Sequence, residues 1–317
     1  MADAIFRVVQ AGPLITIQDS GRPNLMRYGV PNSGAMDRTS LAIANAVLGN
    51  AAYFPAIEVS VAGLTVECIA GSVTLALVGG GFRMQAGDQS IGSWHCVTVH
   101  KGERFSIKSG PWGSWTYLAF AGRLEASSWL GSVATHSQSG FGGGKIATGD
   151  EITIKGAEIR EACVGEIPCP ISARPRHDIR IVLGPQDRFF NADALHALLT
   201  EPFRLTDSYD RMGVRLRGPA LKPDQALSIP SEAILRGSIQ VSGDGTATVL
   251  LSDHQTTGGY PKIATLIEGD IDRFCQLRPH DEVRFSEISP KAAIAVARSR
   301  AKATGDYFTR LAQRIEN

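Results

Sequence analysis

The chain has 317 residues, with 32 basic and 31 acidic side chains spread without blocks, so its formal net charge is +1. This balance argues against a nucleic-acid surface or a polybasic anchor, and no segment resembles a signal peptide or the ~20-residue apolar run of a membrane span. Five scattered cysteines without a Cys-x-x-Cys pair and seven histidines without metal-ligand spacing indicate reduced thiols, no metal site and a cytoplasmic protein.

Short β-branched or alternating runs recur along the chain, separated by glycine-rich turns. This spacing favours barrels or sandwiches over a layered α/β sheet. The predicted strands cover residues 6–9, 14–17, 64–67, 73–78, 97–99, 115–120, 152–154, 179–183, 239–241, 246–251, 263–267 and 283–285.

Helical patterns are fewer, and only three of them are well supported. The first covers residues 37–48 and stops at Gly49; the second covers residues 191–199; the third opens at residue 289, where a serine cap precedes a proline, and continues to residue 303. Beyond Gly305, an apolar stripe repeats at helical spacing, and we expect it to pack on a core rather than form a partner surface. The stripe consists of Phe308, Leu311 and Ile315.

A domain boundary is indicated by Pro168, Pro170 and Pro175, which interrupt regular structure. Each side of this segment carries many strands and one early helix. Residues 96–107 and 275–288 also echo each other, since each reads as two strands joined by a charged turn. We therefore predict two related β-barrel domains, residues 1–170 and 171–317, the second with a C-terminal helix.

Two polar motifs in the first half are candidate anion sites. Asp19 and Arg22 flank a glycine turn after a predicted strand. They form either a structural ion pair or a site where the arginine grips a carboxylate or phosphate with two parallel bonds. Ser33 and Asp37 precede the first predicted helix, where either can cap it, and Gly34 lets the backbone approach a ligand.

The densest polar cluster follows the apolar run 247–252, where a strand should end. Its loop has two glycines, which permit close backbone approach, and a proline that keeps the preceding tyrosine extended. Such loops often carry binding residues, although a plain hydrophilic turn is the alternative. The candidates in this loop are Asp253, Gln255, Thr256, Thr257, Tyr260 and Lys262.

A second charged turn, residues 207–216, sets Asp210, Arg211 and Arg215 near a glycine. It is either a connection between strands or part of a site. Two glycine-rich segments do not match nucleotide motifs. Residues 139–145 lack the phosphate-loop spacing and precede an isoleucine where serine or threonine is required, and residues 79–81 end a strand with no helix after them.

Five motifs carry a resemblance to one family: QDSGR at 18–22, GVPNSGAMD at 29–37, GN at 49–50, YDRMGVRL at 209–216 and DHQTTGGYPKIA at 253–264. From about residue 9 to about residue 298, the chain resembles the biotin-dependent carboxyltransferase family, also known as allophanate hydrolase subunit 2, the C subunit of 5-oxoprolinase and the antagonist of the Kip kinase inhibitor. The resemblance implies a mainly β fold, with two cyclophilin-like β-barrel domains in tandem and a few short helices.

The resemblance also implies a function. Stand-alone bacterial members are most often subunits of ATP-dependent 5-oxoprolinase, which opens 5-oxoproline to glutamate. The implied partners are its B subunit, which is a Kip-inhibitor-like protein, and its A subunit. The alternatives are the carboxyltransferase half of a biotin-dependent urea or amide carboxylase, and a non-catalytic antagonist of a kinase inhibitor. The chain has no nucleotide motif and no Ala-Met-Lys-Met segment for biotin attachment. ATP is therefore expected at a partner or a shared interface, and biotin only on another protein.

The expected ligand is a small amide, and the candidate residues divide into two roles. Asp253, Gln255, Tyr260 and Lys262 are predicted to orient the carbonyl and stabilise developing negative charge, with Lys262 acting as a charge rather than a base. The remaining candidates are predicted to bind the substrate. They are Asp19, Arg22, Ser33, Asp37, Asp210, Arg211, Thr256 and Thr257.

Overall fold

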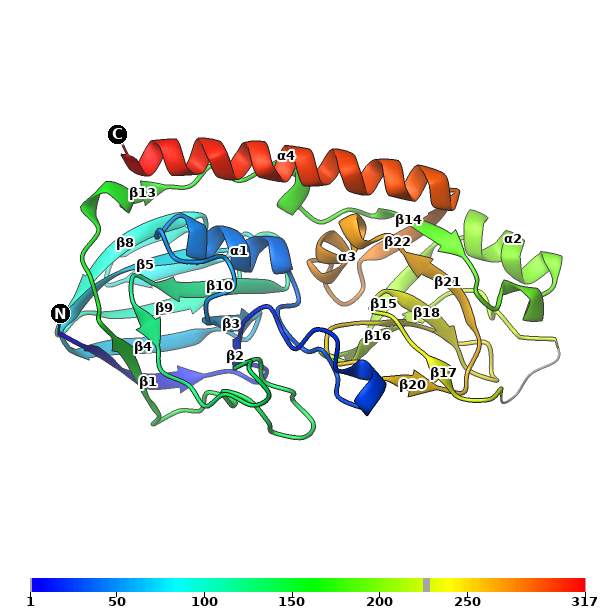
Figure 1. Ribbon diagram of the computed structural model, residues 1–317, viewed down its shortest axis with the longest axis horizontal. Coiled ribbons are helices and arrows are strands. Elements are labelled where there is room, and N and C mark those ends of the chain that lie inside the picture. The colour runs from blue at the N-terminus through cyan, green and yellow to red at the C-terminus, as the bar shows by residue number, and fades with distance from the viewer. Residues whose placement is uncertain (1, 225–228, 317) are drawn as a thin grey trace. The chain divides into compact units, whose positions relative to one another are not determined.

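The computed structural model describes residues 2–224 and 229–316, and the chain divides into two compact units (Figure 1). The first unit comprises Met1–Arg22, Ser33–Arg174 and Thr304–Asn317, and the second comprises Pro23–Asn32 and Pro175–Ala303. The main change of unit falls between Arg174 and Pro175. Two segments leave the unit of their sequence neighbours: residues 23–32 belong to the second unit, and residues 304–317 belong to the first.

The first unit contains two sheets, and its core lies between them. Phe6 joins them, because its ring centroid lies 6.4 Å from Phe105 in its own sheet and 5.5 Å from Phe120 in the other. One sheet has the order β11-β12-β1-β4-β9-β6-β7, with bounds Arg123–Leu124, Glu151–Lys155, Ala4–Ala11, Leu64–Ala70, Arg104–Lys108, Arg83–Ala86 and Gln89–Gly92. The other has the order β13-β8-β5-β10-β3-β2, with bounds Gly165–Glu166, His95–His100, Ser72–Val78, Trp115–Phe120, Ala56–Ser60 and Thr16–Gln18.

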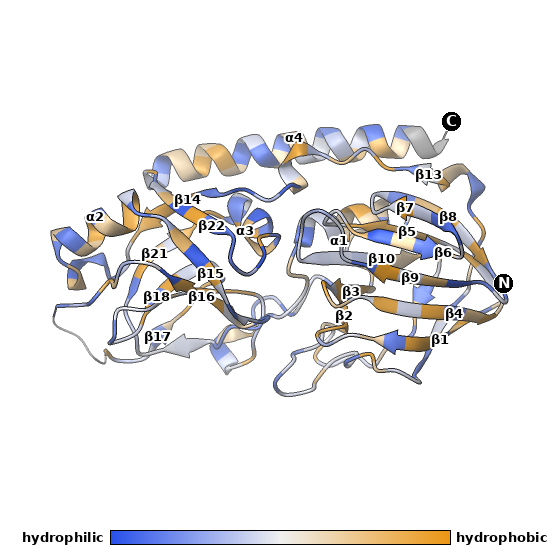
Figure 2. Cartoon of the chain, turned by 180° about the vertical axis from the view of Figure 1, so that it is seen from behind, coloured by the Kyte–Doolittle hydropathy of each residue, from blue (hydrophilic) through white to orange (hydrophobic). Residues whose placement is uncertain are grey.

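The second unit is built on a closed barrel. Its strands follow the order β14-β21-β18-β19-β16-β15-β22, with bounds Asp178–Leu183, Lys262–Leu266, Ser238–Val241, Ala247–Leu250, Gly213–Arg217, Phe203–Tyr209 and Glu282–Glu287. A separate two-stranded sheet pairs β17 (Glu232–Ala233) with β20 (Thr257–Gly258). Hydrophobic and hydrophilic residues alternate along the barrel strands in Figure 2, as expected where one face of a strand is buried.

The prediction of a mainly β fold with barrel architecture is confirmed, and each predicted strand overlaps an observed one. The first two helices are confirmed as α1 (Arg38–Ala46), which packs on β5 and β10, and α2 (Ala192–Thr200). The third prediction was too short. A single helix, α4 (Pro290–Glu316), continues through Gly305. In the described part of the chain, no helix is long and apolar enough to cross a membrane.

The apolar stripe near the C-terminus packs as expected on the core of the first unit. Leu311 is buried there, Phe308 packs against the same cluster, and the hydroxyl of Tyr307 donates to the carbonyl of Pro168 at 2.8 Å. The side chain of Ile315 lies outside the described part of the chain.

The echo between residues 96–107 and 275–288 was wrong for the second segment. Cys275 ends a helix, α3 (Glu268–Cys275), and only β22 follows the charged turn. The sequence did not indicate α3, because its eight residues include four charged ones and begin with Glu-Gly-Asp, and no side chain caps its N-terminus.

Candidate functional site

A row of polar side chains crosses four neighbouring strands of the barrel. Arg215 on β16 pairs across the strands with Thr248 on β19, and Thr248 also pairs with Gln240 on β18. Gln240 in turn pairs with Lys262 on β21, next to a bulge in the pairing of these two strands. Directly opposed residues project from the same face of a sheet. The residues next to them in each strand point to the opposite face and are fully buried in the core. They are Val214, Val249, Ile239, Val241 and Ile263. The polar row therefore lies on the outer face of the barrel.

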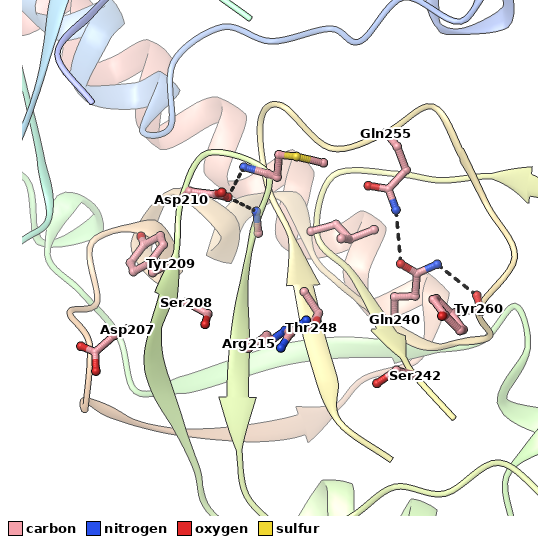
Figure 3. Close-up of a pocket in the computed structure, with 13 residues that line it drawn as sticks. Asp207, Ser208, Tyr209, Asp210, Arg215, Gln240, Ser242, Thr248, Gln255 and Tyr260 are labelled. Atoms are coloured by element: carbon pink, nitrogen blue, oxygen red, sulfur yellow. Dashed lines mark hydrogen bonds between the residues drawn. The ribbon is translucent and has the colours of Figure 1, made fainter. Parts of the chain in front are cut away.

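The loop 253–262 folds over Gln240. The side-chain amide of Gln255 donates to Oε1 of Gln240 at 3.4 Å, and Nε2 of Gln240 donates to the carbonyl of Tyr260 at 3.3 Å (Figure 3). A Cβ added at Gly258 would lie only 2.8 Å from Nε2 of Gln240, so this position admits only glycine without a shift. The glycine in the motif thus lets the loop approach the polar row.

A cavity of about 640 Å³ lies beside this amide chain. Gln255, Tyr260 and Asp210 line it, and three residues belong to both the cavity and the polar row: Arg215, Thr248 and Gln240 (Figure 3). The other lining residues are Asp207, Ser208, Tyr209, Met212, Gly213, Ser242 and Leu250. The cavity offers amide, hydroxyl, guanidinium and carboxylate groups to a small polar ligand.

Lys262 is almost fully buried, with its side chain 2% exposed. Its Nζ lies 3.7 Å from Oε2 of Glu232 and has no hydrogen-bond partner among the described residues. Gln186 holds this pair together, because its Oε1 accepts from the backbone N–H of Lys262 at 2.9 Å and its Nε2 donates to Glu232 at 2.7 Å. A buried ammonium with so few partners retains donors for an oxygen of a ligand.

Asp253 and Arg211 form a buried pair. Nε and Nη2 of Arg211 donate to the two carboxylate oxygens of Asp253, each at 3.0 Å, and both side chains are 1% exposed or less. The backbone N–H of Asp253 also donates to the carbonyl of Arg211 at 2.8 Å. Neither residue lines the cavity, so this geometry favours a role in fixing the start of the loop.

The other predicted residues of this loop and of the 207–216 turn support the backbone. The carbonyl of Thr256 accepts from the N–H of Ile234 at 3.1 Å, and Thr257 pairs with Ala233 in the two-stranded sheet. Oδ1 of Asp210 accepts from the backbone N–H groups of Met212 and Gly213, which closes the turn between β15 and β16.

In the first unit, Asp19 and Arg22 anchor one loop. Asp19 accepts from the hydroxyl of Ser132 at 2.6 Å and from the N–H of Val133 at 2.9 Å. The guanidinium of Arg22 donates to the carbonyls of Trp129, Ser132 and Ala134, and it lies over the Trp129 ring. Both residues thus stabilise segment 129–134, and the anion-site interpretation of this motif stays a prediction.

Asp37 is the cap of α1, and Ser33 is not. The carboxylate of Asp37 accepts from the N–H of Ser40 at 2.9 Å and from its hydroxyl at 2.7 Å. The Asp37 N–H donates to the hydroxyl of Tyr117, which donates to Glu58 at 2.8 Å. Burial, together with the carboxylates of Glu58 and Asp37, raises the pKa of Tyr117 well above its usual value. Ser33 is fully buried, and its hydroxyl has no partner among the described residues.

Within the second unit, the structure brings Gln255, Tyr260 and Asp210 to one cavity. It places Lys262 on the adjoining polar row, next to Gln240 but not among the residues that line the cavity. The sequence did not predict that Gln186, Glu232, Gln240 or Thr248 lies at this site. The signal for Gln240 and Thr248 was a single polar residue inside an apolar strand, Ile-Gln-Val and Ala-Thr-Val. Gln186 and Glu232 gave no local signal, because their role depends on contacts with distant segments.

Comparison with known proteins gives several matches. A family model, the carboxyltransferase domain, subdomain A and B, matches residues 28–287. The chain is 31% identical over 316 residues to the C subunit of 5-oxoprolinase from Escherichia coli (strain K12), covering 99% of both proteins. It is 27% identical over 319 residues to the urea amidolyase of Lachancea kluyveri, covering 91% of this chain but 17% of that protein.

Among solved structures, the urea amidolyase of K. lactis has the same fold, with a TM-score of 0.84 at 24% identity. The match covers 96% of this chain and 20% of that one. This chain therefore spans the full length of the E. coli protein and about a fifth or less of the two urea amidolyases.

Proposed function

The chain belongs to the family of the carboxyltransferase domain, subdomain A and B, and from this premise we propose that it is the C subunit of a 5-oxoprolinase complex. The observation that carries the proposal is the end-to-end match, at 31% identity, with a stand-alone protein of that name. In the proposed complex, the chain acts with companion subunits of the 5-oxoprolinase type to open 5-oxoproline to glutamate with the consumption of ATP.

The site of the second unit suits a cyclic amide. Opening a lactam requires that amide resonance be overcome and that negative charge developing on the carbonyl oxygen be stabilised. A preorganised positive charge out of contact with water is effective in this role. Lys262 supplies such a charge, and Gln186 and Glu232 position it. Gln255 and Tyr260 are proposed to orient the amide from the cavity.

ATP is proposed to bind on a companion subunit. The glycine-rich segment 139–145 of this chain has three glycines at positive φ, but no helix follows it. A Cβ at Gly142 would lie 2.2 Å from the carbonyl of Ala134, so this glycine permits packing of the loop. The segment does not fit a phosphate loop, and the role proposed for this chain is confined to the amide substrate.

The second candidate function is that of a carboxyltransferase in a biotin-dependent urea-type carboxylase. It is favoured by the match to urea amidolyase across 91% of this chain. In that case the biotin would be attached to another protein, and this chain would bind the amide that accepts the carboxyl group.

Reconstitution tests the proposal. The full chain, co-expressed and purified with its companion subunits, is expected to hydrolyse ATP when 5-oxoproline is added and to form one glutamate per 5-oxoproline consumed. Coupled detection of ADP and chromatographic detection of glutamate measure both products, with urea in place of 5-oxoproline as the control. Turnover that requires urea and a biotinylated partner, with none on 5-oxoproline, would establish the second candidate instead.

A further inference from the structure

Arg215 is the one cation on the polar row that lines the cavity, and the function proposed above does not use it. It projects from the middle of β16 beside Thr248, and the amide chain of Gln240 and Gln255 lies across the same cavity (Figure 3). No ion pair joins Arg215 to any carboxylate in residues 2–224 and 229–316. Its guanidinium is therefore available to a ligand.

Two carboxylates also line the cavity, and both have other partners. Asp210 accepts two backbone N–H groups within its own turn, at 2.8 and 3.2 Å. Asp207 lies 3.3 Å from Nε2 of His280, with both side chains largely exposed. The cavity therefore combines the side-chain amides of Gln240 and Gln255 with a single guanidinium, that of Arg215.

We propose that Arg215 binds the carboxylate of the substrate and so makes the site specific for a lactam that carries one. This inference rests on the proposed function and identifies the substrate class of the same cavity. An arginine fork matches a carboxylate with two parallel, charge-assisted hydrogen bonds. 5-Oxoproline has both a lactam and a carboxylate, whereas urea has an amide and no carboxylate. In the proposed complex, Arg215 is thus the residue that favours 5-oxoproline over a lactam without a carboxylate.

The test compares two lactams in the reconstituted complex: 5-oxoproline and 2-pyrrolidinone, which has the same ring without the carboxylate. Arg215→Met is expected to raise KM for 5-oxoproline by about 10- to 100-fold, the range for loss of a charged hydrogen-bonded pair, and to change kcat much less. Apparent binding of 2-pyrrolidinone should change less than about twofold. Arg215→Lys should retain part of the effect.

Arg217→Met is the matched control, because Arg217 lies on the same strand and is exposed but does not line the cavity. It should leave both KM values unchanged. An equal loss for both lactams in Arg215→Met, or no change in KM for 5-oxoproline, would overturn the proposal. Failure of this variant to assemble with its companion subunits would instead assign Arg215 to a partner contact, and would also refute it.

Calorimetric binding of 5-oxoproline to the purified complex separates this inference from the proposed function. If the wild-type complex binds 5-oxoproline without turning it over, and Arg215→Met abolishes that binding, the function is wrong and the carboxylate anchor is right. If turnover of 5-oxoproline is normal in Arg215→Met, the function holds and the anchor is wrong. If the wild-type complex neither binds nor turns over 5-oxoproline, both are wrong.

Discussion

Replacing Lys262 with methionine is expected to lower turnover of the reconstituted complex by about 10²- to 10³-fold, the loss that follows removal of one preorganised electrostatic contact to a developing oxyanion. The Nζ of Lys262 is buried and has no hydrogen bond to a described residue, and its nearest carboxylate oxygen is 3.7 Å away. Burying a charge with so little compensation costs stability. Methionine has a similar shape and no charge, so the thermal midpoint of the variant should be equal to or above that of the wild type.

The measurement is kcat for 5-oxoproline-dependent ATP hydrolysis, together with the thermal midpoint and the elution volume of the complex. Lys222→Met, which removes an exposed lysine of the same unit, is the control and should retain activity. A Lys262→Met complex that keeps near wild-type kcat would show that the buried ammonium is not catalytic. A variant that loses activity only because it unfolds or fails to assemble would show that Lys262 is structural.

Replacing Arg211 with methionine is expected to destabilise the chain by about 3–5 kcal/mol, the usual result when one partner of a buried ion pair is removed. Both oxygens of Asp253 accept from Arg211 at 3.0 Å, so the substitution leaves a buried carboxylate without its guanidinium. For a unit of this size, the loss corresponds to a thermal midpoint lower by roughly 6–20 °C. Urea denaturation of the isolated chain measures the change in the free energy of unfolding.

The double variant Arg211→Met with Asp253→Leu is the control for this pair. Removing both charges should recover much of the stability lost in Arg211→Met, because an apolar pair of similar volume does not incur the desolvation cost. If Arg211→Met is as stable as the wild type, the pair does not fix the loop. A predominantly catalytic role for Asp253 would then be the better interpretation.

The sequence predicted most strands because alternation reports which face of a strand is buried, and this signal is local. It also located the 253–262 loop, because a polar cluster at the end of an apolar strand is a local pattern as well. The polar row was not predictable in the same way. It depends on the pairing of Thr248 with both Arg215 and Gln240, which only the assembled barrel fixes.

The roles of single residues were harder to predict than their segments. Asp19 and Arg22 were expected to pair around a turn or to bind an anion. Asp19 does accept from the N–H of Gly21 in its own turn, but both residues also contact residues 129–134, more than a hundred positions away. Asp37 capped its helix as predicted, because capping depends on neighbours three residues away. Gln186 positions Lys262 across 76 positions of sequence, and no pattern in the chain indicated it.

The outer face of the second barrel, with Lys262 on its polar row, is proposed to bind the amide substrate. Hydrogen exchange of the reconstituted complex, compared with and without 5-oxoproline, tests it most directly. We expect slower exchange on substrate addition in peptides covering residues 238–241 and 253–266. The same protection is expected in Lys262→Met, because this variant loses stabilisation of the developing charge and still binds 5-oxoproline. Protection confined to peptides of the first unit or of the companion subunits, with residues 253–266 unaffected, would contradict it.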